Sequence, residues 1–276
     1  MFISHGKIAL VTFIVGWGSV SSVAHAQDLK DKYWLEAAAY WADVDSTVRI
    51  NSARNQSIGT VIDFESDLAL GDRKVLPSFS AGARVGSKIV IGADYYALKR
   101  TGTTSLARSI IVDDVTYPAS AQIDSSFSSD VYRLTIGYAF VQNDQAEFGV
   151  AIGLHATDFE VSLEGQGQVG NASAQTEVRR RDVLAPLPTI GIFGAVEVAP
   201  QLTLSGRIDY LSLKIDDYKG KLINTQAELS YRVLKNVGIG AMYRYVDYDV
   251  EVDKDKWQGE VKYRFSGPAL FVRIGF

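Results

Sequence analysis

Apolar and polar residues alternate along most of the chain, and the pattern is clearest at the C-terminal end. There, every second residue is apolar: Leu270, Val272, Ile274 and Phe276. The residues between them include Arg273 and Gly275. Because successive side chains of a β-strand point to opposite faces, this spacing predicts a strand with one apolar and one more polar face.

Ten segments follow the same alternation and are predicted to be strands: 33–44, 75–85, 88–100, 127–141, 146–163, 182–198, 202–215, 221–234, 237–250 and 259–276. Short connections near 86, 143, 200 and 235 alternate with longer ones at 45–74, 101–124, 164–181, 216–220 and 251–258. Tight turns on one side and longer loops on the other are typical of membrane barrels. The pattern therefore predicts an all-β fold, a transmembrane up-and-down antiparallel β-barrel of about ten strands. Eight strands is the alternative if the hairpin near 216–220 does not form.

Two other all-β folds fit this pattern less well. A soluble β-sandwich also shows alternation, but it does not need apolar and aromatic outward positions on nearly every strand. A lipocalin-like barrel reverses the pattern, with apolar residues inside and polar residues outside. Aromatic residues flank many of the strands, as in the girdles of membrane barrels, and Tyr138, Tyr210 and Tyr243 are examples.

The first 26 residues are predicted to be a secretory signal. Lys7 precedes the apolar stretch 8–15, and residues 24–26 form an Ala-His-Ala cleavage motif. We therefore expect a single barrel domain at 27–276 and a location in the cell outer membrane after cleavage near Ala26. Removal of Lys7 changes the formal net charge from −4 to −5, which does not favour nucleic acid as a partner.

Composition limits the chemistry further. The chain has no cysteine, which excludes disulfides and a thiol nucleophile. Of the three histidines, His5 and His25 lie in the predicted signal, so His155 is the single histidine of the mature chain. We expect no metal site of the Cys or His type and no cofactor.

The C-terminal strand resembles the closing strand of bacterial outer-membrane β-barrels, in which a terminal Phe on the lipid side is the assembly signal; Phe276 occupies that position. The segment from Asp63 to Leu70, followed by Arg73, Leu76 and Pro77, resembles the acidic signature of uncharacterised proteobacterial outer-membrane β-barrel proteins, small OmpA-like or porin-like barrels. Ala69 stands where that signature usually has glycine. The resemblance implies no known activity.

The predicted inward positions collect charged residues. They are Glu36, Arg84, Asp94, Arg133, Glu197, Arg207, Asp209, Glu228, Arg232, Arg244 and Arg273. Six are basic and five acidic, so we expect an ion-pair network that fills the lumen. The functional alternative is a charged constriction in a small pore.

His155 is the one candidate for general-base chemistry, because the pKa of free histidine lies near 6.5. Thr157 shares its face, a spacing that resembles the His-x-Ser pair of outer-membrane lipid A deacylases with Thr in place of Ser. The Asp-x-His pair of the ten-stranded omptin proteases is absent, because Gly153 stands two residues before His155. A hydrogen-bonded lining residue is the preferred interpretation.

Two further groups are candidates for contacts with lipopolysaccharide or a divalent ion: the acidic residues Asp63, Glu65 and Asp67 and the basic residues Arg179, Arg180 and Arg181. For the acidic group, a solvated loop with Phe64 and Leu68 packed inward is preferred. We expect outer-membrane lipids, lipopolysaccharide and the barrel assembly machinery as partners.

These observations favour a non-enzymatic function: an integral outer-membrane barrel with a structural or small-pore role and surface-exposed loops. Two alternatives remain open. One is an outer-membrane enzyme acting on lipid A or peptides. The other is an adhesin or surface-recognition protein that uses the connections 45–74 and 101–124.

Overall fold

The computed structural model describes residues 29–51, 59–112, 115–169, 172–181, 185–215, 218–254 and 257–276, so the predicted signal and cleavage site lie outside the described residues. Ten long antiparallel strands form a closed ring: β1 (Tyr33–Asn51), β3 (Arg73–Val85), β4 (Ile89–Ser105), β7 (Gln122–Gln142), β8 (Ala146–Val169), β10 (Ala185–Ala199), β11 (Leu202–Ile215), β12 (Tyr218–Leu234), β13 (Val237–Lys254) and β14 (Trp257–Gly275). The ten-stranded barrel is confirmed. Among the described residues, no helix has the length and apolar character needed to cross a membrane.

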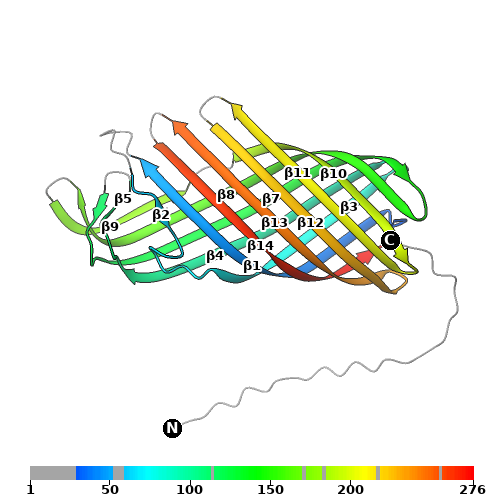
Figure 1. Cartoon of the computed structure of the whole chain (residues 1–276), viewed down its shortest axis with the longest axis horizontal. Coiled ribbons are helices and arrows are strands. Elements are labelled where there is room, and N and C mark those ends of the chain that lie inside the picture. Colours follow the sequence, from blue (N-terminus) through cyan, green and yellow to red (C-terminus); the bar gives the residue numbers. More distant parts are fainter. Residues whose placement is uncertain are drawn as a thin grey trace, which may run out of the picture.

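Four short strands lie beside the ring: β2 (Ile62–Asp63), β5 (Ile110–Val112), β6 (Val115–Tyr117) and β9 (Ala172–Arg181). Figure 1 shows the strands tilted across the barrel, with β2, β5 and β9 near one end and the C-terminus at the other. Following the orientation that the sequence pattern predicts, we call the end with the C-terminus and the tight turns the periplasmic end, and the opposite end the outer end. The ring closes between β1 and β14, where Leu35 lies opposite Ile274.

The strands extend well into segments that the sequence pattern predicts as loops. β1 continues to Asn51, β4 to Ser105 and β13 to Lys254, while β7 already begins at Gln122. The connections predicted at 101–124, 164–181 and 251–258 are therefore largely strands in the described residues, and β1 takes up the first part of 45–74, so that part of the prediction is wrong. The reason is that the side-chain pattern reverses along each strand.

Strand β7 shows the reversal most simply. Toward the periplasmic end its outward side chains are apolar and exposed, such as Leu134 and Ile136. Toward the outer end its outward positions are Asp124, Ser126 and Ser128, while Ile123 and Phe127 point inward and are fully buried. A soluble monomer rarely exposes a continuous apolar belt, whereas membrane barrels do. The barrel thus has an apolar belt around its periplasmic half and a polar outer half with an apolar core.

A turn between β1 and β3 fills the outer half from within. We call residues 62–70 the plug. Phe64 and Leu68 are buried, and the Phe64 ring lies 5.1 Å from the inward-facing Phe127 ring. The Leu68 carbonyl accepts a hydrogen bond from the inward Ser125 hydroxyl, and Gly102 permits its close approach, since a Cβ there would lie 2.4 Å from that oxygen. The plug therefore packs into the core of the outer half.

Candidate functional site

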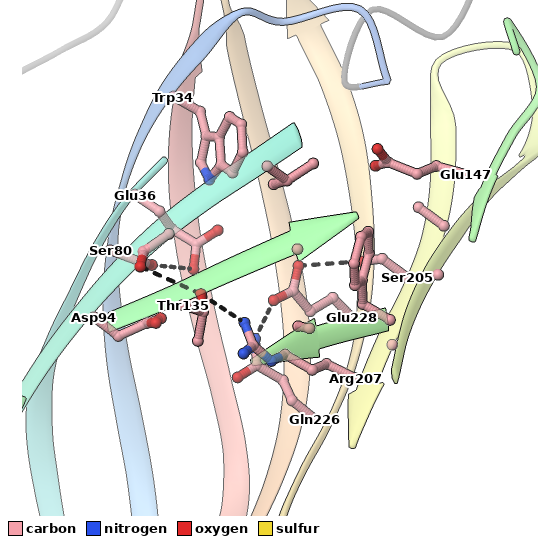
Figure 2. Close-up of a pocket in the computed structure, with 18 of the residues that line it drawn as sticks. Trp34, Glu36, Ser80, Asp94, Thr135, Glu147, Ser205, Arg207, Gln226 and Glu228 are labelled. Carbon is pink, nitrogen blue, oxygen red and sulfur yellow. Dashed lines mark hydrogen bonds between the residues drawn. The ribbon is translucent and has the colours of Figure 1, made fainter. Parts of the chain in front are cut away.

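The lumen of the periplasmic half contains a cavity of about 200 Å³, which we call the chamber. Its wall combines charged side chains from β1, β3, β4, β7, β8, β11, β12 and β14 with the rings of Trp34 and Phe193. Figure 2 shows Glu36, Asp94, Arg207 and Glu228 pointing toward one another from different strands. The inward alternation of each strand explains this convergence, because every second residue faces the lumen.

One group of ion pairs is centred on Arg133, which is 6% exposed. Its guanidinium lies 2.8 Å from Asp94 and 3.3 Å from Asp209. Arg207 reaches the same Asp209 carboxylate at 2.8 Å and donates to the Thr135 hydroxyl. Two arginines and two aspartates from three strands, β4, β7 and β11, are thus joined, and their charges cancel.

A second group is centred on Arg273 of β14, near the place where β14 and β1 close the ring. The Arg273 Nη2 atom lies 2.6 Å from Glu36 and 2.7 Å from Glu228. Ser80 and Ser205 donate hydroxyl hydrogen bonds to these two carboxylates, one to each. Arg84 of β3 binds Glu147 of β8, with one of its two hydrogen bonds at 3.2 Å.

Ten of the eleven predicted lumen charges lie on the inner wall in this way. Arg244 joins them through a 2.9 Å hydrogen bond to Gln226 and lies over the rings of Tyr40 and Tyr96. Glu197 is the exception: it is half-buried at the periplasmic end of β10, opposite Thr203, and forms no ion pair with another described residue.

Sequence reasoning missed two members of this set, Asp31 and Glu147. Asp31 precedes the first strand in a polar segment, and Glu147 is the second residue of β8, directly after a turn. The inward position of Glu147 could have been predicted, because it lies two residues before Gly149 and therefore on the same, inward face of the strand. Asp31 carried no pattern signal. With both included, six carboxylates face six arginines.

Asp31 belongs to a segment, residues 29–32, that crosses the periplasmic end of the ring; we call it the strap. The Lys32 N–H donates to the Phe276 carbonyl at 2.6 Å, and its carbonyl accepts from the Arg84 N–H at 2.7 Å. Lys30 pairs with Asp144 at 3.2 Å, and Asp31 pairs with Arg232. Gly275 leaves room for the Asp31 carboxylate, because a Cβ there would lie 1.7 Å from it. The strap therefore covers the chamber from the periplasmic side.

On the other side of the chamber, inward aromatic rings form a layer across the barrel. We call this set the aromatic layer; its members are Tyr40, Tyr96, Phe127, Phe159, Tyr248, Tyr263 and Phe265. Ring centroids in contact are 5.2–6.4 Å apart.

His155 lies within this layer. It is 1% exposed, its ring stacks on Tyr248, and its Nδ1 is 2.9 Å from the Tyr248 hydroxyl. Thr157 donates to the same hydroxyl at 3.3 Å. His155 does not line the chamber. Its contacts are those of a packed lining residue, without a place for a substrate beside the imidazole.

The three acidic residues of the plug point to different partners. The Glu65 carboxylate accepts from the Ser46 N–H and hydroxyl at 3.0 and 2.9 Å and pairs with Arg100, which is 2% exposed. Asp67 pairs with Arg108 at 2.7 Å, and Asp63 accepts from the Ser66 N–H.

No cluster of three or more acidic or histidine side chains that could hold a metal ion occurs within the described part of the chain. Arg179, Arg180 and Arg181 lie in β9 opposite residues of β8, with Arg181 facing Glu160 in the register, and their side chains lie outside the described part.

Comparison with solved structures gives the same architecture. The outer-membrane protease OmpT from Escherichia coli matches with a TM-score of 0.58 at 11% identity, over 94% of this chain and all of that one. The toluene transporter TodX of Pseudomonas putida matches with a TM-score of 0.39 at 9% identity, over 92% of this chain and 93% of its own. Neisserial surface protein A matches with a TM-score of 0.28 at 14% identity, over 89% and 97%. No family model and no curated protein sequence matches. The match to OmpT shows that the chain has the fold of an outer-membrane β-barrel.

Proposed function

We propose that this chain is an integral outer-membrane barrel with a structural role and a lumen that does not conduct. The observation that carries the proposal is the filling of the lumen at successive levels. The chamber charges are paired, the aromatic layer crosses the barrel above them, and the plug occupies the outer half. A small pore needs a continuous hydrated path lined by polar groups. In the described residues the core of the outer half is apolar instead.

The apolar belt supports the membrane placement. Large apolar side chains such as Ile152, Ile190 and Leu270 are 59–67% exposed on the outer wall of the periplasmic half. Leaving such a surface in water is unfavourable, and a bilayer removes that cost. The proposed partners are therefore outer-membrane lipids, lipopolysaccharide and, through Phe276, the barrel assembly machinery. The signal at residues 1–26 remains an expectation within this proposal.

Surface recognition is the second candidate function, and the polar outer half favours it. This half stands beyond the apolar belt, and its outward wall carries charged residues such as Asp124, Asp158, Lys262 and Arg264. A protruding, rigid β-structure is suited to contact a partner outside the cell. The enzyme alternative has no comparable support, because His155 is enclosed by the aromatic layer.

A liposome-swelling assay tests the proposed function. We expect liposomes that contain the refolded mature chain to admit small sugars no faster than protein-free liposomes. A porin of known permeability serves as the positive control, and heat-modifiable electrophoretic mobility verifies that the barrel has folded. Rapid sugar entry through folded protein would contradict the closed lumen and support the small-pore alternative.

A further inference from the structure

The hydrogen-bonded ring is incomplete toward the outer end between β10 and β11. In the described part of the chain the pairing of these strands stops at Ile190 and Tyr210, whereas β11 and β12 stay paired up to Ile215 and Tyr218. Residues 185–189 and 211–215 are therefore not paired with each other. On the lumen side, Leu187 packs against Gly220, and Leu211 and Leu222 are buried. The ladder is open at this place, which we call the seam, but the core behind it is covered.

The sequence of β10 prevents the ladder from continuing. The Glu197 N–H donates to the carbonyl of Gln145, next to β8, so odd-numbered residues of β10 direct their backbone groups toward β8. Even-numbered residues then face β11, and these include Pro186 and Pro188. Proline has no N–H, so β10 offers no donor at two consecutive positions of the seam.

The facing edge of β11 keeps its donors. Ile190 faces β11 and lies directly opposite Tyr210, so Ser212 and Lys214 also direct their backbone N–H groups toward the seam. These amides have no partner strand among the described residues. They form a short row of donors at the outer boundary of the apolar belt, just beyond the outward ring of Tyr210.

An apolar furrow leads along the outer wall to these donors. It has a volume of about 630 Å³, is lined by Ile136, Ile152, Leu154, Pro188, Ile190 and Tyr210, and ends at Ser212. A neighbouring hollow shares Ile136, Ile152, Ile190 and Tyr210 with it and continues to Ile89 and Tyr138. The two together lie within the belt, over parts of β4, β7, β8, β10 and β11.

Basic side chains surround the outer end of the furrow. Lys214 follows Ser212 on the same outward face, and Lys221 lies directly across from Ser212 on β12. Both are exposed. Lys219, the cross-strand neighbour of Lys214, is held by Glu251 at 2.9 Å. Two lysines and two backbone amides that lack a partner strand among the described residues lie above the apolar furrow. This combination is complementary to a phosphorylated headgroup above an acyl chain.

We propose that the seam and furrow bind a phosphorylated glycolipid of the outer leaflet, with one acyl chain in the furrow and a phosphate at Ser212, Lys214 and Lys221. The phosphate accepts hydrogen bonds from the Ser212 and Lys214 amides and pairs with the two ammonium groups. The position of these groups at the outer end of the belt selects the outer-leaflet lipid over phospholipids of the inner leaflet. This inference rests on the proposed membrane placement.

Native mass spectrometry of the refolded mature chain in detergent, with purified rough-type lipopolysaccharide or phosphatidylglycerol added, tests the proposal. We expect saturable binding of lipopolysaccharide, reduced at least tenfold in Lys214→Gln/Lys221→Gln and in Ile190→Trp, which fills the furrow. The matched controls are Lys235→Gln, an exposed lysine at a periplasmic turn, and Ile239→Trp, an outward residue of β13 that does not line the furrow.

Unchanged affinity in both seam variants would overturn the proposal, as would equal binding of phosphatidylglycerol. Heat-modifiable mobility of each variant shows that its barrel is intact. If the folded barrel does not admit sugars but binds lipopolysaccharide and phosphatidylglycerol equally, the glycolipid site is refuted and the closed lumen is not. If the barrel admits sugars but still binds the glycolipid selectively, the closed lumen is refuted and the glycolipid site is not.

Discussion

The basic residues that face the chamber are arginines. Five of them form ion pairs, namely Arg84, Arg133, Arg207, Arg232 and Arg273, and Arg244 binds Gln226. The guanidinium stays protonated and offers several donors in a fixed plane, so one arginine can join two carboxylates. Arg133 joins Asp94 to Asp209, and Arg273 joins Glu36 to Glu228. Single side chains thus tie several strands together across the lumen.

Arg133→Met should destabilise the barrel strongly, because it leaves Asp94 without its principal counter-ion in a buried site. Breaking a buried pair in this way costs about 3–5 kcal/mol. Urea unfolding in lipid vesicles, followed by far-UV circular dichroism, measures the loss. Arg264→Met is the control: Arg264 is 53% exposed and pairs with Asp247 at 3.4 Å, so we expect a loss of about 1 kcal/mol or less. Equal losses in both variants would show that the chamber pairs are not the stabilising ones.

Alternation alone places a charge on the inner wall, but it does not identify the partner. It placed Arg133 and Asp94 inward because each strand has a period of two. It did not place Asp31, whose position depends on how the strap folds back over Gly275. Nor did it show that His155 stacks on Tyr248, because these two residues lie 93 positions apart in the sequence, on different strands. The pairing of side chains across a barrel depends on tilt and register, which the sequence pattern leaves open.

At the scale of the strands, the reversal of polarity explains why the barrel is longer than predicted. In β1 the outward residues change from Leu35 to Asp43 and Asp45, while the inward ones change from Glu36 to Val44 and Val48. A search for apolar outward positions ends at this change and assigns the remainder to a loop. The predicted number of strands is still correct, because each strand has a segment in the apolar belt that shows the expected alternation.

One buried ion pair, between Glu65 and Arg100, adds to the packing that holds the plug in the outer half. Glu65→Gln removes the counter-ion of Arg100, whose side chain is 1% exposed. We expect backbone amides of residues 62–70 to exchange with deuterium at least tenfold faster in this variant, because local opening becomes less costly. Hydrogen-exchange mass spectrometry of the folded barrel measures the rate. The control Asp43→Asn removes an exposed pair with Arg73 and should leave the exchange rates of these amides unchanged. If the amides of Glu65→Gln exchange at the same rate as those of the unmodified protein, the ion pair does not anchor the plug.

The terminal strand provides a test of assembly. The Phe276 side chain is 64% exposed on the outer wall, while its backbone bonds to Tyr33. Phe276→Ser should lower the amount of protein in the outer membrane several-fold, as measured by membrane fractionation and immunoblotting. Leu234→Ser is the matched control, since Leu234 is 67% exposed near the same end. Equal amounts of both variants would contradict a special role for the C-terminal residue.

At the scale of the whole molecule, two environments are stacked within one ring of strands. The periplasmic half has an apolar belt and a charged lumen, and the outer half has a polar wall and an apolar core. The aromatic layer lies between them. This arrangement separates the chamber from the outside and lets the outer half fold like a small soluble β-structure. Only the first half was predictable from the sequence, since the core of the second depends on the plug.

Single-channel recording of the mature chain, refolded in detergent and added to a planar bilayer, tests the closed lumen most directly. We predict no discrete current steps from the folded protein, because the aromatic layer and the plug interrupt any water-filled path. Arg133→Gln and Arg244→Gln should also remain silent, since the aromatic layer and plug are retained. Discrete steps that shift when either arginine is neutralised would contradict the account and identify a pore with a charged lumen.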